Sequence, residues 1–461
     1  MFRDRRVIGI CTAELDSQFQ TKLLMRVVKE LNSLGYYVMV FASDSDMFHL
    51  TESDLADASV FNLMNLERVD VVLIFSETIK QQSILGHIVD RTVKANKPVI
   101  SIGAELHQCY NVIYDTDTAF EQMVRHIVEY HNLREINFIS GLKGNPVAER
   151  RFEIYRKVLE DNDIIFEPDR VGYGDFWFGP TRQVMDEFIH PSKVAPEAII
   201  CANDSMAVTV CDYLREHDIK VPEEIIVGGI DGIEEGIKHS PAITTCVRNE
   251  VRDAKTIADL VRQLCEGKRI SEMTVLEYRL QLSQSCGCQK KHLFDSDALI
   301  TKLNFELEAY HTDIRRYTEM AEEYMRCTND EQFWQVVEKY MPDNSFLCVN
   351  ADLMQEGGDS SPRQPDGFTD HLLSMVKREG KAQRSDCALD KVVPEAGKDM
   401  PYDKPVILLP IHFSDKIVGY MGVWDEIDDR IWAVRLIHYL LKLDVSAGLL
   451  LAKGIQLLSE E

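Results

Sequence analysis

The first 285 residues alternate between apolar runs of strand length and longer segments in which apolar residues recur at helical spacing. The strand-like runs are Val7–Cys11, Tyr37–Phe41, Val69–Phe75, Pro98–Ile102, Asn111–Tyr114, Glu135–Ser140, Ala198–Cys201 and Ile225–Ile230. The helix-like segments are Gln18–Ser33, Gln81–Ala95, Thr118–His131, Val147–Asn162 and Ser205–His217. Strands that are apolar throughout, separated by amphipathic helices, predict parallel sheets covered on both faces.

These strands are too many for one doubly wound sheet in a domain of this length. We therefore predict that residues 1–290 form an α/β domain of two lobes, each built on a doubly wound parallel sheet. The chain is expected to cross between the lobes near Asn111–Thr116 and to return near Ala242–Cys246.

The pattern changes after residue 290. From Leu303 to Tyr324, apolar residues recur at intervals of four and three, which is the heptad spacing of a coiled coil. Residues 291–329 are therefore predicted to form a helical linker, although a single amphipathic helix lying on a domain fits the same spacing. A second heptad seam, from Leu436 to Leu457, predicts a terminal signalling helix over residues 431–461.

Residues 330–430, between the two seams, predict a small α+β domain. Its expected elements are helices at Gln332–Tyr340 and Phe368–Arg378, a strand at Ser345–Asn350, and a hairpin of Val406–Ile411 with Ile417–Val423.

Composition narrows the classes of partner. Lys and Arg number 51 against 76 Asp and Glu, a net charge of −25, so a broad face for nucleic acid or for anionic membranes is not expected. No secretory signal and no membrane-spanning run is found, which predicts a cytoplasmic protein. Eleven scattered cysteines fit small buried side chains in a reducing compartment.

The motifs of nucleotide-binding loops, serine hydrolases and zinc proteases are absent from the sequence. No catalytic residue and no cofactor is predicted, and this chain is not expected to be an enzyme. Cys286 and Cys288 are the one closely spaced cysteine pair, and without a second cysteine or histidine pair at metal spacing they do not predict a zinc site.

Polar and aromatic residues follow several strands, where ligands bind in doubly wound sheets. The candidate ligand-binding residues are Asp16, Phe19, Arg151, Phe176, Trp177, Asn203, Asp204 and Asp231. Carboxylates, an amide, an arginine and aromatic faces suit a small polyhydroxylated or heterocyclic molecule, such as a sugar derivative or a nucleoside.

Each of these residues has an alternative explanation. Asp204 is also placed to cap a helix that starts at Ser205, and Asp231 to form a turn. Arg151 fits a surface helix position, and Trp177 fits packing at the rim of a lobe. Their shared position after strands is what favours a ligand site.

Three runs of residues resemble a known family. The runs Ile200–Ala207 and Ile219–Asp231, with Ser240–Thr245 after them, resemble the effector-binding domain of the lactose-repressor family. The resemblance covers about residues 5–285. It implies a periplasmic-binding-protein-like fold and carries the family's ligand-contacting arginine, aromatic, amide and aspartate onto Arg151, Phe176, Asn203 and Asp231, respectively.

The sequence departs from that family in two ways. Ile154 stands where the family usually has a glycine, and the first strand begins at about Arg6, without a preceding helix-turn-helix. DNA binding through that element is therefore not expected.

The run Gly174–Trp177 and the tail Gln284–Cys288 resemble a narrower group, the cytoplasmic sensor regions of GGDEF diguanylate cyclases, and residues 330–430 then resemble a GAF-type domain. The GGDEF motif itself is absent, because Gly357-Gly358-Asp359 continues as Ser360-Ser361. The predicted function is a small-molecule sensor that acts through its helices, in a parallel homodimer, on a C-terminal output. The alternative is the ligand-binding region of a transcription regulator whose DNA-binding domain lies outside this chain.

Overall fold

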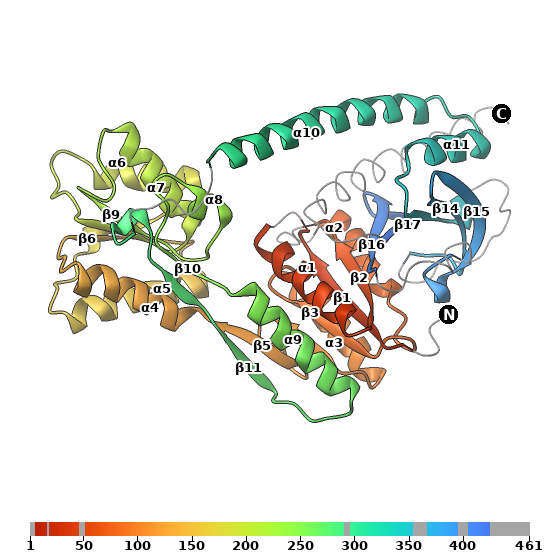
Figure 1. The fold of residues 1–461 in the computed structure, drawn as a ribbon, viewed down its shortest axis with the longest axis horizontal. Helices are drawn as coiled ribbons and strands as arrows, with labels where there is room; N and C mark the ends of the chain where they lie inside the picture. The colour runs from red at the N-terminus through yellow and green to blue at the C-terminus, as the bar shows by residue number, and fades with distance from the viewer. Residues whose placement is uncertain are drawn as a thin grey trace. The chain divides into compact units, whose positions relative to one another are not determined.

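The computed structural model describes residues 5–15, 18–45, 51–289, 296–353, 367–394 and 404–424 (Figure 1). The chain folds into two compact units. The first unit comprises residues 1–113, 254–274 and 304–461, and the second comprises residues 114–253 and 275–303. The predicted crossing near Asn111–Thr116 is confirmed. The predicted return near Ala242–Cys246 is wrong, because the chain leaves the second unit only after Asp253.

The later return has a structural cause. Strand β10 (Thr245–Val247) pairs antiparallel with β12 (Arg279–Gln281), and Thr244 bridges to Gly228 of the second unit's main sheet. The segment around residue 245 is therefore held within the second unit by backbone hydrogen bonds.

The second unit is built on a four-stranded parallel sheet in the order β7-β6-β8-β9. Its strands are β6 (Ile136–Ser140), β7 (Val171–Tyr173), β8 (Ala198–Cys201) and β9 (Ile226–Gly228). Its helices are α4 (Thr116–Arg125), α5 (Pro146–Asp161), α6 (Phe178–Phe188), α7 (Asp204–Glu216) and the short α8 (Glu234–Lys238). Every residue of β6 and β8 is buried, as expected for strands covered on both faces.

The helix predicted over Thr118–His131 changes form near its end. After α4 the chain makes a π-helical turn, η2 (His126–Tyr130), closed by a hydrogen bond from the His131 N–H to the His126 carbonyl at 3.4 Å. Such turns are rare and are often found at functional sites.

The first unit contains an eleven-stranded sheet in the order β11-β5-β4-β3-β1-β2-β16-β17-β13-β14-β15. Its earlier strands are β1 (Val7–Ala13), β2 (Tyr37–Ser43), β3 (Val71–Phe75), β4 (Val99–Ile102), β5 (Tyr110–Asp115) and β11 (Met273–Glu277). Its helices in this part are α1 (Gln18–Ser33), α2 (Glu52–Ala58), α3 (Gln82–Lys94) and α9 (Glu250–Cys265). Strands β1 to β5 pair in parallel, which confirms the predicted doubly wound lobe.

The C-terminal strands continue the same sheet. They are β13 (Ser345–Asn350), β14 (His371–Arg378), β15 (Lys381–Ala388), β16 (Val406–Phe413) and β17 (Lys416–Trp424), and helix α11 (Asp330–Tyr340) precedes them. The predicted helix over Phe368–Arg378 is wrong, because residues 371–378 pair antiparallel with both β13 and β15. The helix, the strand and the hairpin predicted elsewhere in this region are confirmed.

Strand β16 pairs in parallel with β2, so the predicted α+β domain is continuous with the first lobe. Met39, Val40 and Phe41 stand opposite Val406, Ile407 and Leu408, respectively. Close to this junction, the imidazole Nε2 of His412 lies 2.9 Å from the Asp57 carboxylate, and both side chains are 1% exposed. A GAF-type identity for these strands stays a prediction.

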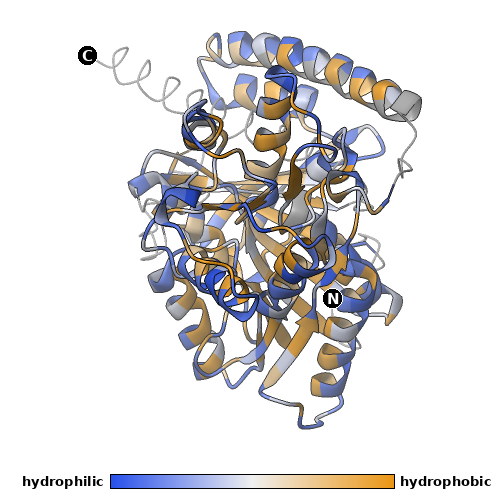
Figure 2. Cartoon of the chain, turned by 90° about the vertical axis from the view of Figure 1, so that its left-hand side faces the viewer, coloured by the Kyte–Doolittle hydropathy of each residue, from blue (hydrophilic) through white to orange (hydrophobic). Residues whose placement is uncertain are grey.

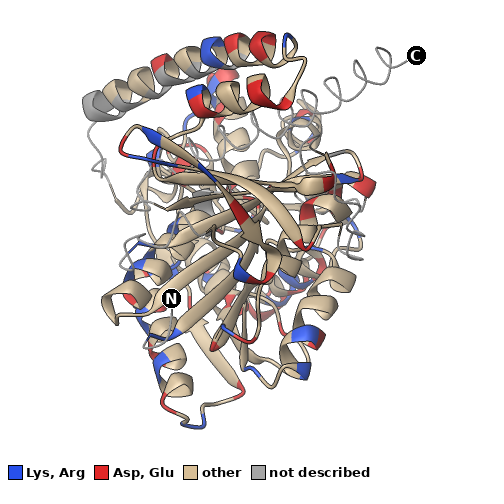
Figure 3. Cartoon of the chain, turned by 90° about the vertical axis from the view of Figure 1, so that its right-hand side faces the viewer, with Lys and Arg blue, Asp and Glu red and all other residues tan. Residues whose placement is uncertain are grey.

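Helix α10 (Ser296–Tyr324) confirms the predicted helical linker, whereas the predicted helix over 431–461 lies outside the described residues. Many of the strands are largely hydrophobic, and the helices show both hydrophobic and hydrophilic residues (Figure 2). Acidic and basic residues are interspersed on helices and loops and do not gather into one basic face in the view of Figure 3. Within the described ranges, no helix combines the length and apolarity that a membrane crossing needs.

Candidate ligand-binding site

A buried arginine and an aspartate meet beyond the carboxyl ends of the second unit's strands. Arg151, on α5, is 8% exposed, and its Nη2 lies 3.5 Å from Oδ1 of Asp231 in the loop after β9. Its Nη1 donates to the carbonyl of Ala202, which follows β8. The alternative of a surface arginine is therefore wrong for Arg151. It describes the preceding Arg150, which is exposed and pairs with acidic neighbours.

Asp231 lies in a strained loop. Its φ of 128° is a backbone conformation that residues other than glycine rarely adopt. Strain of this kind persists where surrounding structure enforces it, and it is concentrated at ligand-binding and catalytic sites. The turn predicted as the alternative for Asp231 is present, and it directs this residue toward Arg151.

Asp204 enforces the conformation of that loop. Its Oδ2 accepts hydrogen bonds from the backbone N–H of Gly232 at 2.7 Å, that of Ile233 at 3.1 Å, and the hydroxyl of Thr245 at 2.8 Å. Burial, together with the nearby charge of Asp231, raises the pKa of Asp204 to about 7. Asp204 is the first residue of α7 and not its cap, so the predicted capping role is wrong.

Asn203 is the residue that caps the N-terminus of α7. Its Oδ1 accepts from the N–H of Met206 at 2.9 Å, which satisfies a donor in the first turn of α7. Its amide Nδ2 donates to the carbonyl of Phe176 at 3.3 Å and so ties the loop after β7 to the loop after β8.

Phe176 is held in an uncommon conformation above the end of β6. Asp175 and Phe176 have φ of 52° and 60°, in the left-handed region that bulky residues rarely occupy. A side chain at Gly141 would put its Cβ 2.0 Å from the Phe176 ring, so glycine at this position lets the ring lie against the backbone.

Trp177 is 60% exposed, and its ring centroid lies 5.0 Å from that of Phe178. Asp16 lies outside the described residues. Phe19 lies in α1 of the first unit, and its side chain is likewise not described. Ile154, in place of the expected glycine, is 4% exposed and packs in the core of the second unit.

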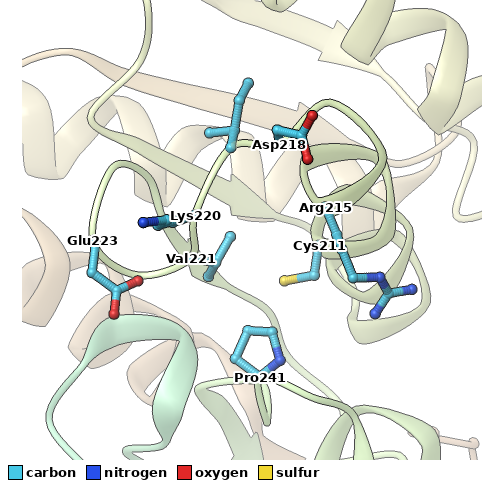
Figure 4. Close-up of a pocket in the computed structure, with 8 residues that line it drawn as sticks. Cys211, Arg215, Asp218, Lys220, Val221, Glu223 and Pro241 are labelled. Atoms are coloured by element: carbon cyan, nitrogen blue, oxygen red, sulfur yellow. The ribbon is translucent and has the colours of Figure 1, made fainter.

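A separate pocket of about 320 Å³ lies in the second unit, where α7 ends and the chain leads into β9 (Figure 4). The C-terminal half of α7 and the loop before β9 line it, with Cys211, Arg215 and Pro241 among the lining residues. Because ligands of doubly wound sheets bind at the carboxyl ends of strands, this pocket does not correspond to the predicted site.

Some neighbours of the site have no signal in the sequence pattern. The Ala202 carbonyl, Gly141 and Thr245 take part through backbone position or distant packing. Outside this site, Cys286 and Cys288 lie beside two histidines, His126 and His131, although the sequence predicts no metal site there.

Comparisons with known proteins show what parts of this chain resemble. The family model described as a periplasmic binding protein-like domain matches residues 124–286. The HTH-type transcriptional repressor PurR of Aliivibrio fischeri (strain MJ11) is 24% identical over 275 residues, 58% of this chain and 78% of the repressor. PurR of Vibrio atlanticus is 25% identical over 211 residues, 45% of this chain and 62% of the repressor.

Solved structures of regulators also match. A sugar-binding transcriptional regulator of the LacI family from Escherichia coli, complexed with phosphate, matches with a TM-score of 0.49 and 16% identity, over 60% of this chain and 97% of that chain. The complex of the transcriptional regulator CelR with cellobiose matches with a TM-score of 0.49 and 20% identity, over 61% of this chain and 85% of that chain.

Residues 124–286 thus match a periplasmic binding protein-like domain, and the parallel sheets of the chain agree with such a fold. The curated relatives named above are transcriptional repressors. They therefore favour the ligand-binding region of a transcription regulator, the alternative from the sequence, over the sensor region of a GGDEF protein.

Proposed function

We propose that this chain is the small-molecule-sensing region of a regulator, and that the second unit contacts the ligand through Arg151, Asp231, Asn203 and Phe176. The observation that carries the proposal is the buried Arg151 beside Asp231 at the carboxyl ends of the strands. Asp16 and Phe19, predicted as ligand contacts from the sequence, stay predictions.

The chemistry of these groups favours a polar ligand with a ring. The Asp231 carboxylate accepts hydrogen bonds and the Arg151 guanidinium donates them. Together they can bond to vicinal hydroxyl groups or to the polar edge of a heterocycle. The Phe176 ring offers a face for stacking, and the exposed Trp177 next to it offers a second. A sugar derivative or a nucleoside has both features. Asp204 acts as a positioning residue, because it holds the loop of Asp231.

The signal would reach the output as a ligand-dependent shift between conformations. The curated relatives are transcriptional repressors, which supports transcriptional regulation as that output. A cytosolic homodimer is proposed on the sequence alone. Coupling to a diguanylate cyclase has less support, since none of the relatives and structures described above is a cyclase.

Thermal-shift screening tests this proposal. The full chain is heated with a panel of monosaccharides, disaccharides, sugar phosphates and nucleosides, and at least one compound is expected to raise the unfolding temperature in a concentration-dependent way. Asp231→Asn keeps the shape of the side chain but removes its charge. It should reduce affinity for that compound roughly tenfold or more, because hydrogen bonds to charged groups contribute about 1.5–3 kcal/mol. An unchanged affinity would contradict the assignment of the site.

A further inference from the structure

Four metal-ligating side chains meet at the edge of the second unit, away from the carboxyl ends of its strands. The Sγ of Cys288 lies 3.4 Å from Nε2 of His126 and 3.5 Å from Nε2 of His131. With the Sγ of Cys286, the ligating atoms of all four residues lie within 4.8 Å of one another. We propose that His126, His131, Cys286 and Cys288 bind one zinc ion.

The two histidines meet because the helix changes form between them. In an α-helix, residues five apart point about 140° away from each other, given 3.6 residues per turn. The π-helical turn η2 bonds residue 131 to residue 126 and so places both imidazoles on one side. Their ring centroids are 5.0 Å apart at an interplanar angle of 88°, and both Nε2 atoms face Cys288.

A tight turn brings the two cysteines to the same place. Cys286 ends the 3₁₀ turn η4 (Gln284–Cys286) and is 2% exposed. Gly287 has a φ of 78°, and this left-handed residue turns the chain so that the exposed Cys288 follows directly. One thiol is thus buried inside the unit, and the other lies at the surface, where an ion has access.

The distances and the donor set match zinc. In a tetrahedral site with Zn–S of about 2.3 Å and Zn–N of about 2.0–2.1 Å, sulfur and nitrogen ligands lie about 3.6 Å apart. The two sulfur–nitrogen distances to Cys288 fall close to this value. Two cysteines and two histidines are a common ligand set of structural zinc sites, and soft thiolates disfavour magnesium and calcium.

Zinc binds neutral imidazoles and thiolates, so the metal displaces the thiol protons of Cys286 and Cys288 when it binds.

The site has a mechanical consequence. Cys288 lies shortly before α10, which begins at Ser296, whereas His126 and His131 belong to the turn after α4. Zinc would fasten the end of the ligand-binding domain to that turn within the second unit. Cys288 would then be the fixed point from which the chain continues toward α10.

Metal analysis of the full chain tests the proposal. Protein purified under reducing conditions, stripped with a chelator and reconstituted with Zn²⁺ should retain about one zinc per chain, with an unfolding temperature above that of the stripped protein. Co²⁺ in place of zinc should show the intense visible bands of a tetrahedral site together with thiolate-to-cobalt charge transfer. These bands distinguish the site from weak surface binding.

Variants assign the ligands. Cys288→Ser and His131→Ala change partly exposed positions, and each should lower zinc affinity by more than about tenfold and remove the cobalt charge-transfer or tetrahedral bands. The matched controls Cys265→Ser and His190→Ala, outside the cluster, should retain wild-type binding. Failure of the reduced wild type to bind stoichiometric zinc would overturn the proposal. Full zinc binding by the Cys288→Ser, His131→Ala double variant would also overturn it. A protein that forms a Cys286–Cys288 disulfide and binds no zinc after reduction would overturn it as well.

Discussion

Arg150 and Arg151 are neighbours in the sequence, yet their environments in the second unit are opposite. The Arg150 side chain is 57% exposed and bonds to Asp117 and Glu153 on the surface. The Arg151 side chain is 10% exposed and faces the strand ends. At the residue scale, the family resemblance assigns the ligand contact to the buried arginine of the two, whereas residue type alone does not distinguish them.

Asp204 predicts a pH dependence of stability. Its pKa in the folded chain is about 7, against an ordinary value of 3.8, so the folded state binds a proton that the unfolded state releases in this window. The stabilisation of the folded state by proton uptake at Asp204 is therefore absent well above pH 7 and grows as the pH falls toward 4. Between about pH 8 and pH 6, wild type should gain about 1 kcal/mol of unfolding free energy relative to Asp204→Asn.

Urea unfolding of both proteins at the two pH values measures this difference. Asparagine keeps the size of the side chain and does not titrate, so the comparison cancels the other ionisable groups. An equal pH dependence in the two proteins would show that Asp204 titrates in its ordinary range.

Gly141 predicts a packing effect on Phe176. Gly141→Ala would place a methyl group 2.0 Å from the ring, so the ring must move, at a cost of about 1–3 kcal/mol. The matched control is Gly179→Ala in α6, where the new methyl group meets no atom within 4 Å and alanine favours the helix. Chemical unfolding should show a loss for the first variant only, and equal stability of the two variants would contradict the described packing.

At the scale of elements, the predicted parallel strands and amphipathic helices of the two lobes agree with the structure because each has a strong local pattern. Residues 371–378 do not, because their apolar residues fit either a helix or a strand, and pairing with β13 and β15 decides the outcome. The sequence pattern also does not predict that His126 and His131 lie side by side. The sequence predicts an α-helix there, in which these residues point apart, and the π-helical turn reverses that expectation.

Helix α10 predicts self-association. Its seam residues Leu303, Leu307 and Ile314 are 53%, 54% and 58% exposed, and burying a leucine or isoleucine stabilises by about 1.5–3 kcal/mol. We expect a parallel dimer through this seam at micromolar concentration. Leu307→Glu with Ile314→Glu should give monomers in light scattering, whereas Glu308→Lys with Arg315→Glu, off the seam, should not. A monomeric wild type would contradict the dimer.

At the scale of the whole molecule, one sheet runs from the first lobe into the C-terminal strands, an arrangement that the sequence pattern does not reveal. A pattern of apolar positions predicts which segments are strands. It does not show that β2 pairs with β16, more than 350 residues later in the chain. The same limit applies to the contacts of Arg151, which are made with the loops that follow two different strands, β8 and β9.

The junction between β2 and β16 predicts a long-range effect of His412. Its partner Asp57 is fully buried, and removing one partner of a buried hydrogen bond leaves the other unsatisfied, at a cost of about 1–3 kcal/mol. His412→Ala should lower the unfolding free energy accordingly and increase hydrogen exchange in residues 37–43. The control His371→Ala breaks an exposed contact to Asp386 and should change stability by less than about 0.5 kcal/mol. Unchanged exchange in residues 37–43 would contradict the continuous sheet.

The most direct measurement of the central claim is isothermal titration of the compound found by thermal shift into three proteins: wild type, Arg151→Ala and Arg150→Ala. Wild type and Arg150→Ala should bind with the same affinity, because Arg150 faces solvent. Arg151→Ala should lose roughly tenfold to a hundredfold in affinity while retaining a cooperative unfolding transition. Equal affinity for all three proteins would contradict a ligand site at the carboxyl ends of the second unit's strands.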